Sequence, residues 1–395
     1  MTILDPQTIL SGQRRRGVPA GAIITIGVSS LCLAVFLIFL LLLGGGLFYI
    51  AAVLSLVTLV PMMAGVMAID RLEPEPVHLL VTTFLWGAGA SVILSLIFES
   101  LGGLVMQPWM YDTEFAEVAI AAPIVEESMK ALVLLGLFWF RRHEINGITD
   151  GVVYACTVAL GFAAAENIEY YIIFGYDGPG SLIFTFILRG IMSPFCHPVF
   201  TSMTGIALAL AIRKRSAGVR FLYVIGGLLV AFLLHGLWNG LAFFGYLGLG
   251  IAFIIIVGVM VGILIAVRVD RLRTIARIHD CMEAYIPTGL VTEGDRAMLS
   301  TLEHRKHARD WAKANRGKTG FNAMRDYQQA CTELTMLHDR ANDGLVRPAD
   351  FEAHRQVLML LMRMAREAFL GPSYLSAPMV APVPPPAQLG GLQTT

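Results

Sequence analysis

The stretch APIVEESMKALVLLGLFWF, residues 122–140, has the apolar flanks of a bilayer-spanning helix, but its middle carries Glu126, Glu127 and Lys130. A span needs about 20 apolar residues to cross roughly 30 Å of hydrocarbon. Ionisable groups inside a span cost several kcal/mol unless they face a protein interior or water. The stretch therefore predicts a membrane helix that forms one wall of a helical bundle with a polar interior.

The composition of the whole chain is that of an integral membrane protein. Of its 395 residues, 56% are hydrophobic and only 15% are charged, and the mean hydropathy is +0.68, whereas soluble proteins have about 25% charged residues. The formal net charge is +0, which gives no support for a nucleic-acid partner. The five cysteines are scattered without a CxxC pair, a pattern typical of packing residues in a reducing compartment.

Eight segments are long and apolar enough to span a membrane, so we expect an all-α, polytopic bundle of about eight transmembrane helices in contact with lipid. Their approximate bounds are 21–43, 46–69, 78–101, 114–140, 148–175, 181–212, 218–244 and 247–267. Arginine and lysine occur before the first span, in every second connector and after the last span. By the positive-inside rule, both termini are predicted to be cytoplasmic.

The remaining regions are polar. We predict a cytoplasmic N-terminal segment (residues 1–20), the transmembrane domain (21–267), a cytosolic helical domain (268–370) and a Pro-rich, disordered tail (371–395). In the cytosolic domain, Thr292 and Asp295 have the spacing of a helix cap. The helices of residues 268–370 could bind a cytosolic regulator, although no motif identifies it.

Polar residues recur at one depth in four of the predicted spans. Counted from the cytoplasmic end, each lies about 14 to 16 residues into its span, or roughly 21 to 24 Å. They are Glu126, Glu166, His197 and His235. Helices of alternating direction would thus bring two carboxylates and two imidazoles to one level, nearer the outer face than the midplane.

Helical spacing adds neighbours to these four residues. Pairs four residues apart can share one helix face, and here they are Glu126 with Lys130, Phe162 with Glu166, and His235 with Asn239. Pro194 and Pro198 flank His197 and should break the sixth span locally, which is tolerated where the backbone lines a cavity.

The chemistry available to such a cluster points to hydrolysis. Carboxylates and imidazoles can hold a divalent metal that activates water, or they can deprotonate the water directly. Asparagine and histidine donors can steady an oxyanion. An ion- or proton-coupled transporter is the main alternative, because carboxylates and histidines also make proton relays, but no inverted repeat is evident. A catalytically silent scaffold is a third reading.

Three other polar residues have simpler explanations. Arg189 lies near the outer end of its span, where its long side chain is expected to reach the interface. Glu99, at the outer end of the third span, is expected to do the same. Asp150 begins the fifth span and is predicted to cap it.

The ordered motifs resemble those of the PrsW family of intramembrane proteases, which are related to the CAAX-prenyl and bacteriocin-processing membrane proteases. The motifs are EExxK (126–130), FxxxEN (162–167), a histidine (197) and HxxWN (235–239), and the resemblance covers about residues 70–239. It implies an endopeptidase of the bacterial cytoplasmic membrane that hydrolyses a single-span, membrane-tethered protein. An anti-sigma-factor-like substrate, cut first near the outer boundary, would be typical of the family.

The resemblance also implies residue roles. Glu126 would activate water, with Glu127 as the partner of Lys130 or a second acid. The implied catalytic residues are Glu126, Glu127, Glu166, His197, His235 and Asn239, and the implied supporting residues are Lys130, Phe162, Asn167 and Trp238. Zn²⁺ could be held by Glu166, His197 and His235, and a metal-free glutamate mechanism is the alternative. The CAAX-prenyl and bacteriocin-processing relatives carry a histidine where this chain has Glu166, so His197 could take that part.

Overall fold

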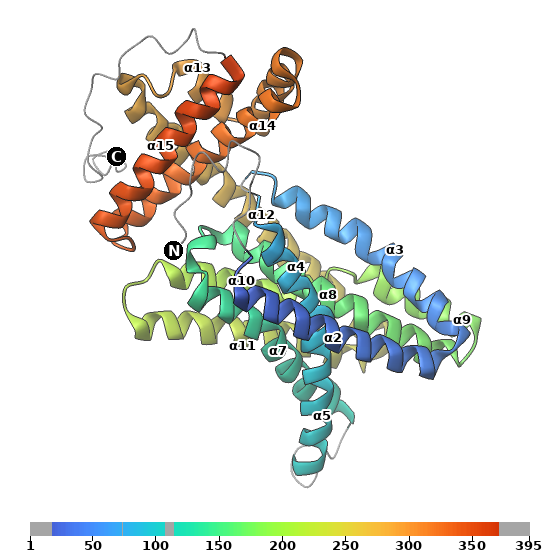
Figure 1. Ribbon diagram of the computed structural model, residues 1–395. Coiled ribbons are helices and arrows are strands. Elements are labelled where there is room, and N and C mark those ends of the chain that lie inside the picture. The colour runs from blue at the N-terminus through green and yellow to red at the C-terminus, as the bar shows by residue number, and fades with distance from the viewer. Residues whose placement is uncertain (1–17, 73, 107–113, 371–395) are drawn as a thin grey trace. The chain divides into compact units, whose positions relative to one another are not determined.

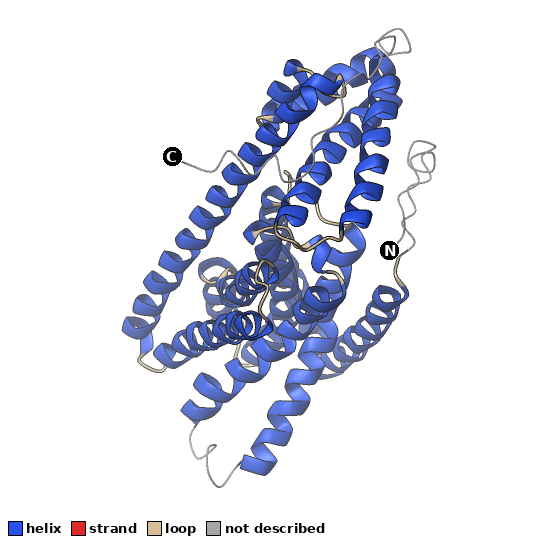
Figure 2. Ribbon diagram, turned by 90° about the vertical axis from the view of Figure 1, so that its left-hand side faces the viewer, coloured by secondary structure: helices blue, strands red, loops and turns tan. Residues whose placement is uncertain are grey.

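The computed structural model describes residues 18–72, 74–106 and 114–370, and within these ranges every regular element is a helix (Figure 1). Figure 2, coloured by secondary structure, shows no strand in the part of the chain that is described. The predicted all-α class is therefore confirmed. The predicted tail (371–395) and nearly all of the predicted N-terminal segment (1–20) lie outside the described residues.

The described chain forms two compact units, residues 18–268 and 269–370. The helices of the first unit, several of which are divided by π-helical turns, have the following bounds. They are α2 (Ala20–Gly44), α3 (Gly46–Ile69), α4 (Val77–Leu85), η1 (Trp86–Ser91), α5 (Val92–Met106), α6 (Glu114–Ala116), η2 (Glu117–Ala121), α7 (Ala122–Phe140), η3 (Arg142–Glu144), α8 (Ile148–Gly175), α9 (Pro179–Thr185), η4 (Phe186–Met192), α10 (Cys196–Ile212), α11 (Ala217–Ala242) and α12 (Gly245–Tyr285), which continues into the second unit.

Seven of the described helices are long and apolar enough to cross a membrane. The predicted span at 114–140 is not among them, because Glu126, Glu127 and Lys130 interrupt its apolar run. Large apolar side chains are exposed on the outer helices, for example Leu42 at 80% and Ile254 at 71%. Such faces are suited to lipid, which supports a membrane-embedded bundle.

The helix α8 lies at the centre of the first unit. Residues 150–163 are buried without exception, and the helix packs against α3, α4, η1 and α10. The contact with α10 is close because two glycines face each other: a Cβ on Gly151 would overlap the carbonyl oxygen of Gly205, and the reverse holds too. Asp150 accepts hydrogen bonds from the backbone N–H groups of Asn146 and Gly147 at 2.6 and 3.1 Å, which confirms its predicted capping role.

Three segments of the described chain are π-helical, namely η1, η2 and η4. Segments of this kind are frequent at functional sites, because the extra residue per turn redirects side chains. Between η4 and α10, residues 193–195 are not helical, so the predicted break beside Pro194 is confirmed. His197 is consequently the second residue of a new helix.

The second unit is a small helical domain with its own apolar core. After α12 come η5 (Ile286–Thr288), α13 (Glu293–Leu299), α14 (Leu302–Asn342), which is broken at Gly317, and α15 (Pro348–Leu370). Tyr285, Tyr327 and Met362 are among its fully buried side chains. The hydroxyl of Thr292 accepts from the backbone N–H of Asp295 at 3.2 Å, which confirms the predicted cap.

Candidate active site

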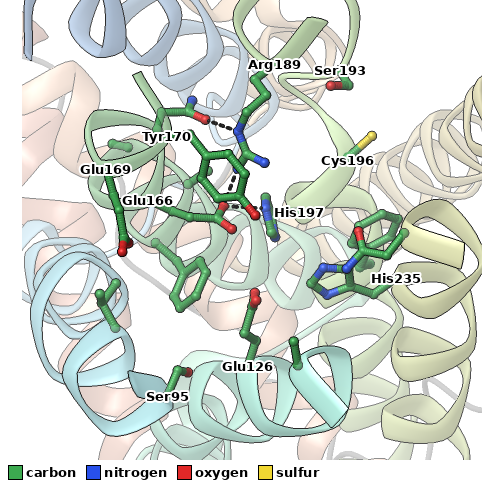
Figure 3. A pocket seen from close by; sticks show the side chains of 18 of the residues that line it. Ser95, Glu126, Glu166, Glu169, Tyr170, Arg189, Ser193, Cys196, His197 and His235 are labelled. Carbon is green, nitrogen blue, oxygen red and sulfur yellow. Dashed lines mark hydrogen bonds and ion pairs between the residues drawn. The ribbon is translucent and has the colours of Figure 1, made fainter. Parts of the chain in front are cut away.

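A cavity of about 290 Å³ lies within the first unit. Side chains of α3, α5, η2, α7, α8, η4, α10 and α11 line it. Figure 3 shows Glu126 on one side of this space, with Glu166, His197 and His235 around it. The four polar residues that the sequence places at one depth thus meet at one cavity.

The ammonium group of Lys130 lies behind this cavity with its side chain fully buried. Its Nζ donates to Glu127 Oε1 at 2.8 Å and to Glu126 Oε2 at 3.1 Å, and it lies 3.0 Å from His197 Nδ1. The ring of Phe162 covers the same ammonium group at 3.9 Å. Lys130 therefore offsets two carboxylates on its own helix and reaches a histidine on another.

Glu127 makes contacts that differ from those of its neighbour Glu126. Its fully buried carboxylate accepts from Thr201 Oγ1 at 2.7 Å and lies 3.2 Å from His235 Nδ1, in addition to the Lys130 contact. Glu126 lines the cavity, whereas Glu127 does not. The two adjacent carboxylates are thus separated by environment, with Glu126 open to a ligand and Glu127 holding three side chains in place.

His197 and Glu166 form a second set of contacts. His197 Nε2 lies 2.9 Å from Glu166 Oε2. Because the Lys130 ammonium group can only donate hydrogen bonds, its contact requires an unprotonated Nδ1 on His197. The Nε2 atom of His197 therefore carries the proton and donates a hydrogen bond to Glu166. Glu166 also pairs with the guanidinium group of Arg189.

The other predicted residues also lie in or beside the cavity. Asn239 Nδ2 donates to the backbone carbonyl of Val118 at 2.9 Å, which ties α11 to η2. Asn167 Oδ1 accepts from Arg189 Nε at 2.8 Å. Trp238 lines the cavity, as do the two asparagines.

Arg189 is a residue whose position the sequence predicted wrongly. It does not extend to the interface: its guanidinium group binds Glu166 and Asn167 and stacks over the ring of Tyr170 at 3.8 Å. The reason is local, because Arg189 belongs to the π-helical segment η4. In the sequence, the acceptor side chains of Glu166 and Asn167 are the feature that could have indicated a cationic partner at this depth.

Comparison with known proteins identifies the family. A Protease PrsW of Clostridioides difficile is 30% identical over 192 residues, which cover 47% of this chain and 77% of that relative. The family model described as PrsW family intramembrane metalloprotease matches residues 75–267. The chain belongs to this PrsW family. It is therefore an enzyme, an intramembrane peptidase, as the motifs predicted.

Other proteins named Protease PrsW are similar over the same part of the chain. Those of Oceanobacillus iheyensis and Geobacillus kaustophilus are each 29% identical, over 165 and 174 residues, and each match covers 70% of the relative and 42% or 44% of this chain. The search of solved structures gave no match. The helices after residue 267 lie outside the matched family region.

The PrsW family is described as metalloproteases, and the cavity contains a suitable donor set. Among the described residues, Glu126, His197 and His235 each offer a donor atom, and these atoms lie within 4.8 Å of one another. Two imidazoles and one carboxylate are a common donor set of catalytic zinc, and the cavity provides the open side. The residues present fit zinc in kind. The predicted set had Glu166 in place of Glu126, and the Glu166 carboxylate pairs with Arg189 and His197. To bind zinc, His197 would exchange its contact with Glu166 for the metal, because its other ring nitrogen lies against Lys130.

Proposed function

We propose that this PrsW-family peptidase hydrolyses a single-span membrane protein by attack of a water molecule bound beside Glu126. The observation that carries the proposal is the convergence of Glu126, His197 and His235 on one cavity within the bundle, with Glu127 and Lys130 directly behind them. Polar groups of this kind inside an apolar bundle are costly, and enzymes place them where charge develops during the reaction.

Each side chain has a role that its contacts support. Glu126 takes the proton of the attacking water, and Lys130 Nζ, 3.1 Å from its carboxylate, holds that carboxylate in position. Glu127 accepts from His235 Nδ1, which leaves Nε2 as the ring nitrogen that no described residue binds. The second N–H of Asn239 Nδ2 stabilises the oxyanion of the substrate carbonyl, whereas His235 Nε2, which is unprotonated when Nδ1 donates, accepts a hydrogen bond from the attacking water.

Zinc would fit the same residues. Held by Glu126, His197 and His235, it would supply Lewis-acid chemistry and make a bound water easier to deprotonate. Glu127 behind His235 Nδ1 has the position of the carboxylate that commonly orients a metal-binding histidine. Without metal, the carboxylate of Glu126 removes the proton alone. The contacts of Lys130 with Glu126 and His197 support this second route.

The substrate proposed from the family resemblance is an anti-sigma-factor-like protein with one span, cut near the outer boundary of the bacterial plasma membrane. Eight crossings with both termini in the cytoplasm would place residues 268–370 where a cytosolic regulator can bind them. Cysteine labelling from each side of intact cells, at the 146 and 178 connectors, tests this topology. Labelling of both connectors from the same side would contradict it.

The decisive test of the site uses purified protein in liposomes with a single-span reporter. Glu126→Gln and His235→Ala should abolish cleavage while the thermal unfolding temperature stays within a few degrees of that of the unmodified protein. Glu114→Gln, at an exposed position outside the cavity, is the matched control and should cleave normally. Normal cleavage by both site variants would disprove these roles.

Metal content separates the two chemical routes. Mass spectrometry of the active preparation should show one zinc ion per chain if zinc is used, and His197→Ala should reduce that content. Full activity in a preparation without stoichiometric metal would leave the metal-free glutamate mechanism. The transporter alternative has no support from the relatives, which are proteases.

A further inference from the structure

Three carboxylates line the same cavity and take no part in the proposed chemistry. They are Glu99 on α5, Glu117 on η2 and Glu169 on α8. No described residue forms an ion pair or hydrogen bond with any of them. By contrast, the carboxylates of the catalytic cluster are held by Lys130 or Arg189.

A hydroxyl group without a partner among the described residues lines the same cavity. Ser95 lines the cavity and is only 3% exposed, and its Oγ has no hydrogen-bond partner in the part of the chain that the structure describes. Figure 3 shows this hydroxyl directed toward the cavity. Ser95 and Glu99 are four residues apart on α5 and so share one helix face. A buried polar group without a partner is costly, which indicates that the group meets a ligand when the cavity is occupied.

The charges around the cavity do not balance. Among the described residues, two cations, Lys130 and Arg189, are outnumbered by six carboxyl groups that line the cavity or contact these cations: Glu99, Glu117, Glu126, Glu127, Glu166 and Glu169. Buried carboxyl groups in such a cluster disfavour one another's ionisation, and a cation beside them would favour it. Like charges repel strongly where water is scarce. A ligand with a positive charge would relieve that repulsion, so the cavity should select for a cationic group.

The arrangement of the carboxylates does not favour a single metal ion as that ligand. In the described chain, the donor atoms that come within 4.8 Å of one another are those of Glu126, His197 and His235, and neither Glu99 nor Glu169 joins them. Their carboxylates come from different helices, which suits a branched or extended organic cation. Arg189 shows how this cavity holds a guanidinium group, between Glu166 and the face of Tyr170.

We infer that Ser95, Glu99 and Glu169 form a subsite for a lysine or arginine side chain of the substrate, close to the peptide bond that is cut. This inference rests on the proposed protease function and defines its substrate class. The long side chain of lysine or arginine would place its charge among the carboxylates while its backbone lies beside Glu126. Glu117 is exposed and would contribute to the negative potential at the entrance.

A set of reporters tests the subsite in full-length protein in liposomes. Each single-span reporter carries Lys, Gln or Glu at one position near the cleavage site, and the substituted position is moved along the segment. At one position or more, the kcat/KM of the unmodified enzyme should be at least about tenfold higher for the Lys reporter than for the Gln reporter. The reason is that a hydrogen bond to a charged group typically contributes a factor of about ten or more to binding. The Glu99→Gln/Glu169→Gln variant should bring this ratio close to one, and Glu114→Gln should leave it unchanged.

The outcomes separate the subsite from the protease function. If the enzyme cleaves Lys and Gln reporters equally at every position, the subsite is wrong and the protease function stands. If no reporter is cleaved by any form, the protease function itself is wrong. Zinc or calcium that binds stoichiometrically and is lost in Glu99→Gln/Glu169→Gln, but not in Glu126→Gln, would show a metal site and overturn the inference.

Two further variants guard against a folding defect. Ser95→Ala removes only the hydroxyl and should lower the Lys:Gln ratio by a smaller factor. Glu169→Lys should reverse the preference, so that the Glu reporter is cleaved faster than the Lys reporter. The subsite is contradicted if both variants melt at the normal temperature and neither changes the ratio of kcat/KM between the Lys and Gln reporters.

Discussion

Lys130 Nζ lies 3.0 Å from His197 Nδ1, so an ammonium group on α7 fixes the tautomer of an imidazole on α10. With Nδ1 accepting, the Nε2 proton of His197 points to Glu166. Through Glu166 the same chain of contacts reaches Arg189 and Asn167. One buried cation thus orders polar groups on three of the helices that line the cavity.

Removing that cation should destabilise the fold. Lys130→Met would leave Glu126 and Glu127 buried without their counter-charge, at a cost of about 3–5 kcal/mol. Thermal unfolding in detergent should show a clearly lower midpoint than for Arg215→Met, whose side chain is exposed. Adding Glu127→Gln to Lys130→Met should recover part of the loss. A single variant as stable as the unmodified protein would mean that the carboxylates are not charged in the folded state.

Arg189 should matter for both stability and cleavage. Arg189→Met would remove the donors of Glu166 and Asn167, which we expect to cost about 1–3 kcal/mol and to slow cleavage of a reporter. Arg189→Lys keeps the charge without the two-pronged contact and should be intermediate. If Arg189→Met has the same melting temperature and the same cleavage rate as the unmodified protein, the Arg189 side chain extends to the interface instead.

Close packing of α8 against α10 gives a prediction with a built-in control. Gly151→Ala would press a methyl group against the Gly205 carbonyl, force the helices apart and cost roughly 1–3 kcal/mol. Gly136→Ala meets no atom within 4 Å and should be neutral or stabilising by up to about 1 kcal/mol. Both are measured by thermal unfolding in the same detergent. Equal melting temperatures for the two variants would contradict the close approach of the helices.

The second unit should lose stability in acid. Burial, with a smaller contribution from Arg355, lowers the pKa of His338 from 6.5 to about 4. Between these two pH values the unfolded chain binds a proton that the folded chain does not bind. The free energy of unfolding is therefore highest above pH 6.5 and falls by about 3 kcal/mol as the pH decreases toward 4. Hydrogen exchange of core peptides within residues 278–369 should show this loss in the unmodified protein.

A pair of histidine variants checks the assignment to His338. His338→Gln should show a smaller loss of protection between pH 6.5 and 4, because glutamine does not titrate. His307→Gln, at an exposed position, should behave as the unmodified protein. The same acid sensitivity in both variants would assign the effect to other groups.

The helices and the principal polar residues could be predicted because membrane insertion constrains them. Hydropathy located the bilayer-spanning helices, and counting residues along each helix put Glu126, Glu166, His197 and His235 at one depth. The break at Pro194 followed from the missing backbone N–H group and the clash of the proline ring. These properties depend on local chain chemistry.

Arg189 and Glu99 show where such prediction stops. Both lie near the ends of apolar spans, where extension to the interface is the simplest expectation, yet both line the cavity. Depth along a helix fixes one coordinate, but the direction of a side chain also depends on rotation about the helix axis. The π-helical segment η4 changes that rotation for Arg189, and only its neighbours determine the result.

The sequence by itself determined an all-helical membrane protein, the order of its motifs and the depth of its polar residues, because composition and 1.5 Å per residue suffice for these. The tertiary structure alone decided the partners. It joined Glu127 to His235, Lys130 to His197 and Arg189 to Glu166, and it left Glu99 and Glu169 at the cavity without an ion pair among the described residues. The physical reason is that ion pairs and hydrogen bonds between helices depend on lateral packing, which no single helix specifies.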